Sequence, residues 1–147
     1  MRAAFALCAA LLFAPPAFAA DPPVPKLFRD IAAEKGQWRM HILEIERDGQ
    51  AQRPRVPTIS LCTDNVLKPQ EAREAGRAAC SYRLERDTAD AAVIESTCPD
   101  RTSRVALNRE GANSVLMQVE SRGPRGLARM KTRFTYEGAC REGATPP

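Results

Sequence analysis

The sequence predicts a mainly β domain, an antiparallel meander curled into a half-barrel or sandwich, with one or two short helices. Apolar and polar residues alternate in several stretches, most clearly over 127–138, and a period of two is typical of a strand with one buried face. Short turn sequences separate these stretches, so we expect successive strands to pair antiparallel. An even number of cysteines outside the amino-terminal segment indicates a small domain held by disulfides.

Residues 1–19 have the pattern of a signal peptide. Arg2 precedes an apolar run over 3–14, and the small residues Ala17 and Ala19 are typical of a cleavage site, which we place after Ala19. The apolar run is shorter than the roughly 20 residues of a membrane-spanning helix. A retained anchor is therefore the disfavoured alternative, and we expect a periplasmic protein with no transmembrane anchor after processing.

Removal of the signal leaves one domain's length of chain. We expect a flexible leader over 20–25, a single β domain over 26–142 and a flexible tail over 143–147. The signal holds one of the 22 basic residues and none of the 18 acidic ones, so 21 basic and 18 acidic residues give the remaining chain a net charge of +3. This charge is too small to indicate a nucleic-acid-binding protein.

A helix of one or two turns is expected over 26–35. Leu27, Phe28 and Ile31 share one face at helical spacing, and Gly36 is a typical residue after a helix end. We expect this helix to cover one end of the sheet.

The first strand starts at Gln37, where Trp38, Met40 and Ile42 alternate with polar residues. The alternation slips over 43–45, which predicts either a β-bulge or the end of the buried stretch. A turn at 48–49 and a loop that extends to Pro57 follow.

A short strand is expected over 58–62, followed by a surface helix that begins at Thr63 or Asp64 and ends near Ala75. The remaining strands are expected at 81–86, 92–97, 103–109, 114–121 and 127–138.

Four of the five cysteines belong to the expected domain, because Cys8 lies in the signal. The four are Cys62, Cys80, Cys98 and Cys140. They allow three pairings, which the sequence does not decide between. We favour Cys62–Cys80 with Cys98–Cys140, because the first pair brackets the expected helix and the second pair ends two expected strands.

The chain offers few groups for catalysis or metal binding. It has one histidine, His41, and lacks the close Cys-x-x-Cys pairs of structural zinc sites, so we expect no metal and no cofactor. A hydrolase would have to use His41, which the alternation places toward solvent, or two of the strand glutamates. Those glutamates are Glu44, Glu46, Glu85 and Glu95. Charged strand residues are more often solvated or salt-bridged than catalytic.

Nine basic residues against four acidic ones lie between Cys98 and Arg141. Among them, Arg129, Lys131 and Arg133 share one face of the last strand. This basic face is a candidate site for an anionic lipid or an acidic envelope protein. The alternative is an ordinary solvent-facing sheet surface, paired across strands with Glu120.

Three aromatic side chains fall on inward-facing strand positions: Trp38, Phe134 and Tyr136. They are candidate ligand contacts. The alternative, packing in the hydrophobic core, is the commoner fate of large aromatic side chains.

Three short motifs carry a resemblance to a known family. Gly36-Gln37-Trp38 opens the first strand, Cys62-Thr63 ends the second, and Gly138-Ala139-Cys140 closes the last. This order resembles an exported Gram-negative family known as a domain of unknown function, with a Gly-x-Trp start, four cysteines and a terminal Gly-x-Cys. Thr63-Asp64-Asn65 departs from the Thr-Pro-Glu-like helix start of its members. The resemblance implies a periplasmic β domain with no catalytic residues to carry over.

We therefore expect a periplasmic, non-enzymatic binding or interaction module. The alternatives are a small hydrolase that uses His41 or a pair of glutamates, and a structural or inhibitory partner of an envelope protein. An envelope protein or an anionic lipid is the expected partner, and nucleic acid is not.

Overall fold

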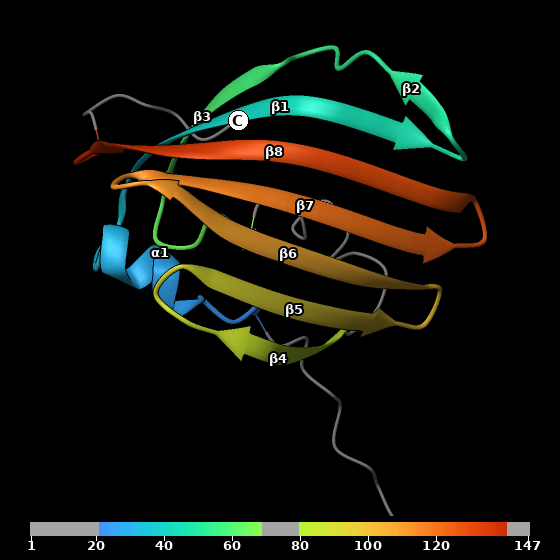
Figure 1. Cartoon of the computed structure of the whole chain (residues 1–147), viewed down its shortest axis with the longest axis horizontal. Helices are drawn as coiled ribbons and strands as arrows, with labels where there is room; N and C mark the ends of the chain where they lie inside the picture. Colours follow the sequence, from blue (N-terminus) through green and yellow to red (C-terminus); the bar gives the residue numbers. More distant parts are fainter. Residues whose placement is uncertain (1–20, 69–79, 141–147) are drawn as a thin grey trace, which may run out of the picture.

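The computed structural model describes residues 21–68 and 80–140, and in these ranges the chain forms one curved sheet with a single short helix (Figure 1). In chain order the elements are α1 (Lys26–Ile31), β1 (Gly36–Arg47), β2 (Gln50–Gln52), β3 (Thr58–Thr63), β4 (Ser81–Asp87), β5 (Ala91–Cys98), β6 (Arg101–Gly111), β7 (Ser114–Gly123) and β8 (Gly126–Gly138).

The sheet is an antiparallel meander that does not close. Strands β4 to β8 pair in succession, β8 then pairs with β1, and both β2 and β3 pair with the other edge of β1. The order across the sheet is β2-β1-β8-β7-β6-β5-β4. The mainly β prediction is confirmed, and the single curled layer is a half-barrel rather than a sandwich.

The expected bulge in β1 is present. Ile42 pairs with Thr132 and Glu44 pairs with Lys131, so the register with β8 shifts across Leu43. The extra residue restores the alternation. As a result, Ile45 lies on the same concave face of the sheet as the residues that precede the bulge.

The core lies between the concave face and α1. Phe28 of α1 packs edge-on against Trp38 of β1 and Phe134 of β8, with ring centroids 5.6 and 6.2 Å apart. The two residues Val66 and Leu67, which follow β3, are buried in the same cluster. The apolar face of α1 predicted from the sequence is therefore confirmed, and it covers one end of the half-barrel.

The leader over 20–25, expected to be flexible, is instead packed against the domain over its described residues. Pro22 and Pro25 are buried, and the side-chain amide of Asn65 donates a hydrogen bond to the carbonyl oxygen of Pro22 at 3.0 Å. A proline-rich composition suggested mobility, but buried proline rings with a backbone hydrogen bond are held in place.

Helix α1 ends at Ile31, before the expected end at residue 35, because Ala32 is in an extended conformation. Gly36 is part of β1. A Cβ atom at Gly36 would collide with the ring of Tyr136, so glycine is needed there for the close approach of β1 to the aromatic side chain.

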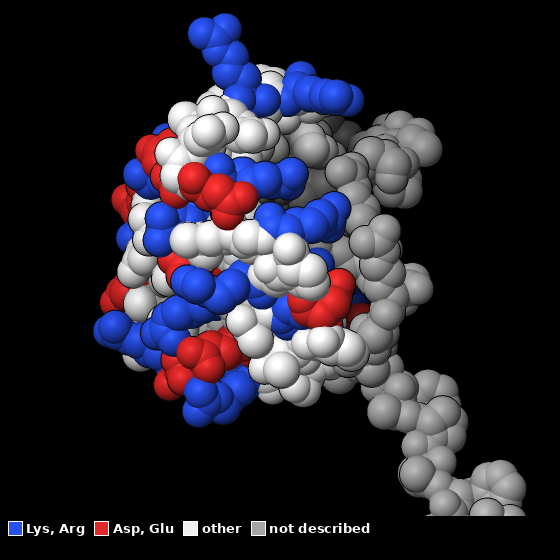
Figure 2. Space-filling model, turned by 90° about the vertical axis from the view of Figure 1, so that its right-hand side faces the viewer, with Lys and Arg blue, Asp and Glu red and all other residues white. Residues whose placement is uncertain are grey.

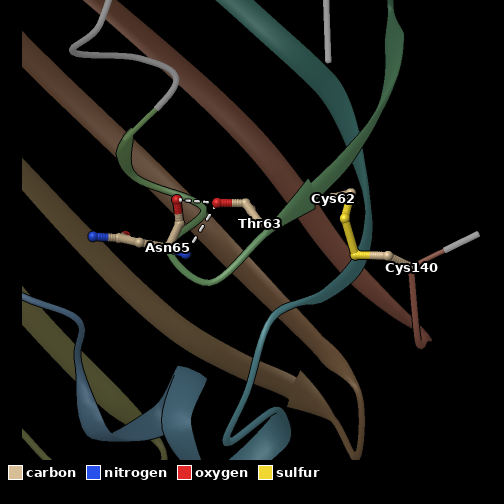
Figure 3. Close-up of a disulfide and its surroundings, with 4 residues drawn as sticks. All are labelled: Cys62, Thr63, Asn65 and Cys140. Atoms are coloured by element: carbon tan, nitrogen blue, oxygen red, sulfur yellow. Dashed lines mark hydrogen bonds between the residues drawn. A yellow bond between two sulfur atoms is a disulfide. The ribbon is translucent and has the colours of Figure 1, made fainter. Parts of the chain in front are cut away.

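The favoured disulfide pairing is wrong. The bonds join Cys62 to Cys140 and Cys80 to Cys98. Gln37 of β1 pairs with Cys62 on one side and with Gly138 on the other, which brings the end of β3 close to the residue after β8. Figure 3 shows the resulting bond next to the Thr63–Asn65 turn, where the Asn65 N–H donates to Thr63 Oγ1 at 3.0 Å.

The second bond follows from the β4–β5 hairpin. Ser81 pairs with Thr97, so their neighbours Cys80 and Cys98 lie side by side, with Cα atoms 4.3 Å apart. Two disulfides indicate an oxidising environment. In the ranges described, no helix has the length and apolar character needed to cross a membrane.

The remaining strands lie close to their expected ranges, and β2 is an addition within the expected loop. The surface helix was expected to begin at Thr63 or Asp64, but Thr63 ends β3 and residues 64–67 are not helical. The rest of that expected helix, as far as Ala75, falls mainly outside the described residues.

Candidate functional site

A row of hydroxyl side chains crosses the concave face beyond the part covered by α1. Each member pairs with the next on the neighbouring strand, from β4 to β7. This hydroxyl row consists of Tyr82, Ser96, Ser103 and Ser121. Ser103 Oγ donates a hydrogen bond to Ser121 Oγ at 3.0 Å. The same register continues through Ala128 of β8 to Arg47 of β1.

An apolar row lies next to the hydroxyl row, one step closer to α1. Its members are register partners across six strands. The apolar row consists of Leu84, Ile94, Val105, Val119, Met130 and Ile45. Val105, Val119 and Met130 are only half-buried where they pack against the core, so their exposed sides form an apolar wall.

The two rows line a cavity of about 270 Å³. The apolar row contributes Ile45, Val105, Val119 and Met130 to the lining. The other described lining residues are Ser96, Ser103, Ser121, Ala128, Arg101, Arg129 and the Cys80–Cys98 disulfide. Such a mixture of an apolar wall with a few polar groups is typical of small-molecule sites. We call it the concave cavity, and it is the candidate functional site.

The basic face of β8 lies on the opposite, convex side of the sheet, and each of its cations is ion-paired. Arg129 contacts Glu46 and Glu120, both at 3.0 Å. Lys131 contacts Glu44 at 3.3 Å, and Arg133 contacts Glu110 at 2.6 Å. These contacts favour the alternative of a surface paired across strands, and an anionic partner for this face stays a prediction.

The remaining strand glutamates form a ring of salt bridges on the same convex side. Arg83 contacts Glu95 at 2.7 Å and Glu85 at 2.8 Å, and Arg104 contacts the same two carboxylates at 2.7 and 2.6 Å. The hydrogen bond from Arg83 lowers the pKa of Glu95 from its ordinary value. A carboxyl group with a lowered pKa is a poor proton donor near neutral pH.

His41 is exposed on β1, as expected from the alternation. Its Nδ1 lies 2.8 Å from Thr58 Oγ1 on β3. This pair is remote in register from the hydroxyl and apolar rows, because His41 lies beside Arg133 on the convex side.

The three aromatic candidates lie in or against the core rather than in the cavity lining. Trp38 is 3% exposed and Phe134 is fully buried. Tyr136 packs against Trp38 with ring centroids 5.2 Å apart. Their contacts are those of core packing, the alternative that the sequence left open.

The sequence reasoning missed the concave cavity. A signal for it was present, because Ser96, Ser103 and Ser121 each occupy an inward-facing position in a strand where apolar residues are expected. Three such serines on consecutive strands indicate a polar patch inside the curl. The described residues hold no group of three side chains suited to bind a metal ion.

The family suggested by the three sequence motifs stays a resemblance. No family model, no curated protein and no solved structure matches this chain.

Proposed function

We propose that the protein is a periplasmic, non-enzymatic binding module that holds a small ligand in the concave cavity. The observation that carries this proposal is the cavity of about 270 Å³ where the hydroxyl row meets the apolar row.

The chemistry of the cavity supports a ligand with both apolar and polar parts. Val105, Val119 and Met130 offer apolar surface that is only half-buried. Burial of such surface by a ligand is favourable, at about 25 cal/mol per Å². Hydroxyl groups of the neighbouring row donate or accept hydrogen bonds, and a few such groups in an apolar site fix the orientation of a ligand.

The expected location supports the same proposal. Residues 1–19 have the pattern of a signal peptide, and both disulfides suit an oxidising compartment. A small domain cross-linked in this way keeps its shape without a large core. A fixed half-barrel is therefore a suitable frame for a preformed binding site.

The test uses the neutral fluorescent probe 1-N-phenylnaphthylamine with the purified, processed protein. The native protein should raise the probe's fluorescence in a saturable way. Val119→Phe places a larger side chain in the concave cavity and should weaken binding about tenfold or more. Gln118→Phe is the matched control, because Gln118 is the neighbour on β7 and points to the convex side; its binding should equal that of the native protein.

Ser121→Leu is a second variant that narrows the cavity from the hydroxyl row. Urea denaturation of each variant confirms that it is folded. Absence of saturable binding to the native protein would overturn the proposal, and so would native-like binding by both cavity variants.

A further inference from the structure

We propose that the ligand of the concave cavity is a single-chain amphiphile with a carboxylate headgroup. Its alkyl chain lies along the apolar row, and its headgroup lies between Arg101 and Arg47 at one end of the sheet. This inference rests on the proposed function and adds the chemical class of the ligand.

The end of the sheet opposite α1 is formed by three turns, at 48–49, 99–100 and 124–125. We call it the hairpin end. A second cavity, of about 240 Å³, lies there, lined by Arg47, Arg101, Arg125, Asp100, Ser121, Ala128 and the 123–126 turn. It shares Arg101, Ser121 and Ala128 with the concave cavity. The two cavities are therefore neighbours, one with an apolar wall and the other rich in arginine.

The charge of the hairpin end is suited to an anion. Three guanidinium groups and one carboxylate line the second cavity. One of the three, that of Arg101, also has another interaction partner. In the part of the chain that the structure describes, no salt bridge to Arg47 or Arg125 is found. By contrast, Arg104, Arg129 and Arg133 on the convex side are paired with glutamates. Figure 2, which faces this end, shows Lys and Arg side chains over much of the surface, with fewer acidic side chains between them.

The strand register directs two of these arginines to the concave side. Arg47 is the register partner of Ala128, which continues the register of the hydroxyl row onto β8. Arg101 is the partner of Cys98, whose disulfide lines the cavity. Gly123 lies against Arg101, since a Cβ atom at Gly123 would lie 3.1 Å from Arg101 Cβ and 3.0 Å from the Asp100 carbonyl oxygen. This close contact fixes the start of β6 beside β7.

The size of the concave cavity favours one alkyl chain. Sites for drug-sized ligands are about 300 to 1,000 Å³ in volume, and the concave cavity has about 270 Å³. A lipid with two long chains would exceed it. Arginine binds a carboxylate through two parallel hydrogen bonds, and the hydroxyl of Ser121, present in both linings, is a further donor for the same headgroup.

The test measures displacement of 1-N-phenylnaphthylamine by decanoate, decanol, decyl phosphate and decyltrimethylammonium, each below its micelle concentration. Decanoate should bind most tightly to the native protein. Arg101→Gln should weaken decanoate binding about tenfold or more, as expected for loss of a charged hydrogen bond, and Arg47→Gln should weaken it by a smaller factor. Neither variant should change the affinity for decanol by more than about twofold, because the neutral headgroup loses no ionic contact.

Arg122→Gln is the matched control, because it removes the same charge at the same end of the sheet but on the convex side. Its decanoate affinity should be native. Urea denaturation shows whether Arg101→Gln is folded. Arg47→Gln is a second variant that changes an exposed residue and leaves the half-buried Arg101 in place. High salt should weaken decanoate binding and leave decanol binding unchanged.

The outcomes separate this inference from the proposed function. Equal affinities for decanoate and decanol, or native decanoate binding by both arginine variants, would overturn the carboxylate headgroup while probe binding still supports the module. Tighter binding of decyl phosphate than of decanoate would overturn the choice of a carboxylate. Failure of the native protein to bind the probe itself would overturn the proposed function.

Discussion

Asp48 and Leu127 join two turns of the hairpin end through a pair of hydrogen bonds. The Asp48 N–H donates to the Leu127 carbonyl oxygen at 2.8 Å, and the Leu127 N–H donates to Asp48 Oδ1 at 2.8 Å. Asp48 has a positive φ of 50°, a conformation that aspartate and asparagine tolerate better than most residues. The turn after β1 is thus fixed to the start of β8.

Asp48→Ala should lower the free energy of unfolding by about 1 to 2 kcal/mol, because it removes one hydrogen bond acceptor and places alanine at a positive φ. Asp48→Asn should cost less, since its side-chain oxygen still accepts the hydrogen bond. Urea denaturation measures both. Equal losses for the two variants would contradict this account.

The two disulfides should contribute unequally. The Cys62–Cys140 bond closes a sequence separation of 78 residues and the Cys80–Cys98 bond one of 18. Loop-entropy estimates give about 3 kcal/mol for a short loop and more than about 4 kcal/mol for the long one. Cys62→Ser/Cys140→Ser should therefore destabilise more than Cys80→Ser/Cys98→Ser in thermal denaturation. Peptide mapping of the oxidised protein that showed Cys62 joined to Cys80 would contradict the observed pairing.

Thr132 offers a stabilising substitution. Its side chain is fully buried, and its Oγ1 has no hydrogen-bond partner among the described residues. Thr132→Val has nearly the same shape and removes the unsatisfied hydroxyl, so the free energy of unfolding should rise by about 1 kcal/mol. Guanidinium denaturation measures the change, and a loss of stability would show that the hydroxyl has a partner in solution.

The salt bridges of the convex side should make the fold sensitive to acid. The hydrogen bond from Arg83 lowers the pKa of Glu95, and the one from Arg133 lowers the pKa of Glu110. A carboxyl whose pKa is lower in the folded state stabilises the fold above its unfolded value, near 4.5, and this contribution is lost as the pH falls through the lowered pKa.

Urea denaturation between neutral and acidic pH tests this sign. The loss of stability below pH 4.5 should be smaller in Glu95→Gln and Glu110→Gln than in the native protein. The control Glu34→Gln, an exposed residue outside the strands, should keep the native profile. About 1 M NaCl, where the screening length is about 3 Å, should reduce the difference.

The packing of α1 can be followed through the chain's one tryptophan, Trp38. Phe28→Ala removes the ring that contacts Trp38 and Phe134, and loss of a buried phenylalanine costs about 3 to 5 kcal/mol. Tryptophan emission should shift to longer wavelength as water reaches the indole ring. An unchanged emission maximum would show that α1 does not cover the core in solution.

The sequence predicted strands well where one face of a strand is buried, because burial gives the residues a repeat of two. In β8, Met130, Thr132, Phe134 and Tyr136 alternate with charged or polar residues because one face of the strand is covered by the core. The bulge in β1 was visible as a break in the same pattern. Strand β2 carried no such signal, since Gln50–Gln52 is exposed on both faces.

The disulfides and the site depended on contacts that local patterns do not contain. Cys62 lies near Cys140 only because β1 pairs with both β3 and β8, and the sequence does not state which distant strands pair. The concave cavity combines residues from five strands, so its lining was not evident before the register was known. The buried Pro22 was missed for the same reason, because its partner, Asn65, is 43 residues away.

The pairing of β1 with β8 has a consequence for how the chain folds. The first strand of the domain cannot complete its hydrogen bonds until the last strand has been made, so the sheet is complete only when nearly the whole polypeptide is available. Contacts between such distant segments make folding slow. A polypeptide that folds late remains unfolded for longer after synthesis, and the Cys62–Cys140 disulfide can form only once these distant segments have met.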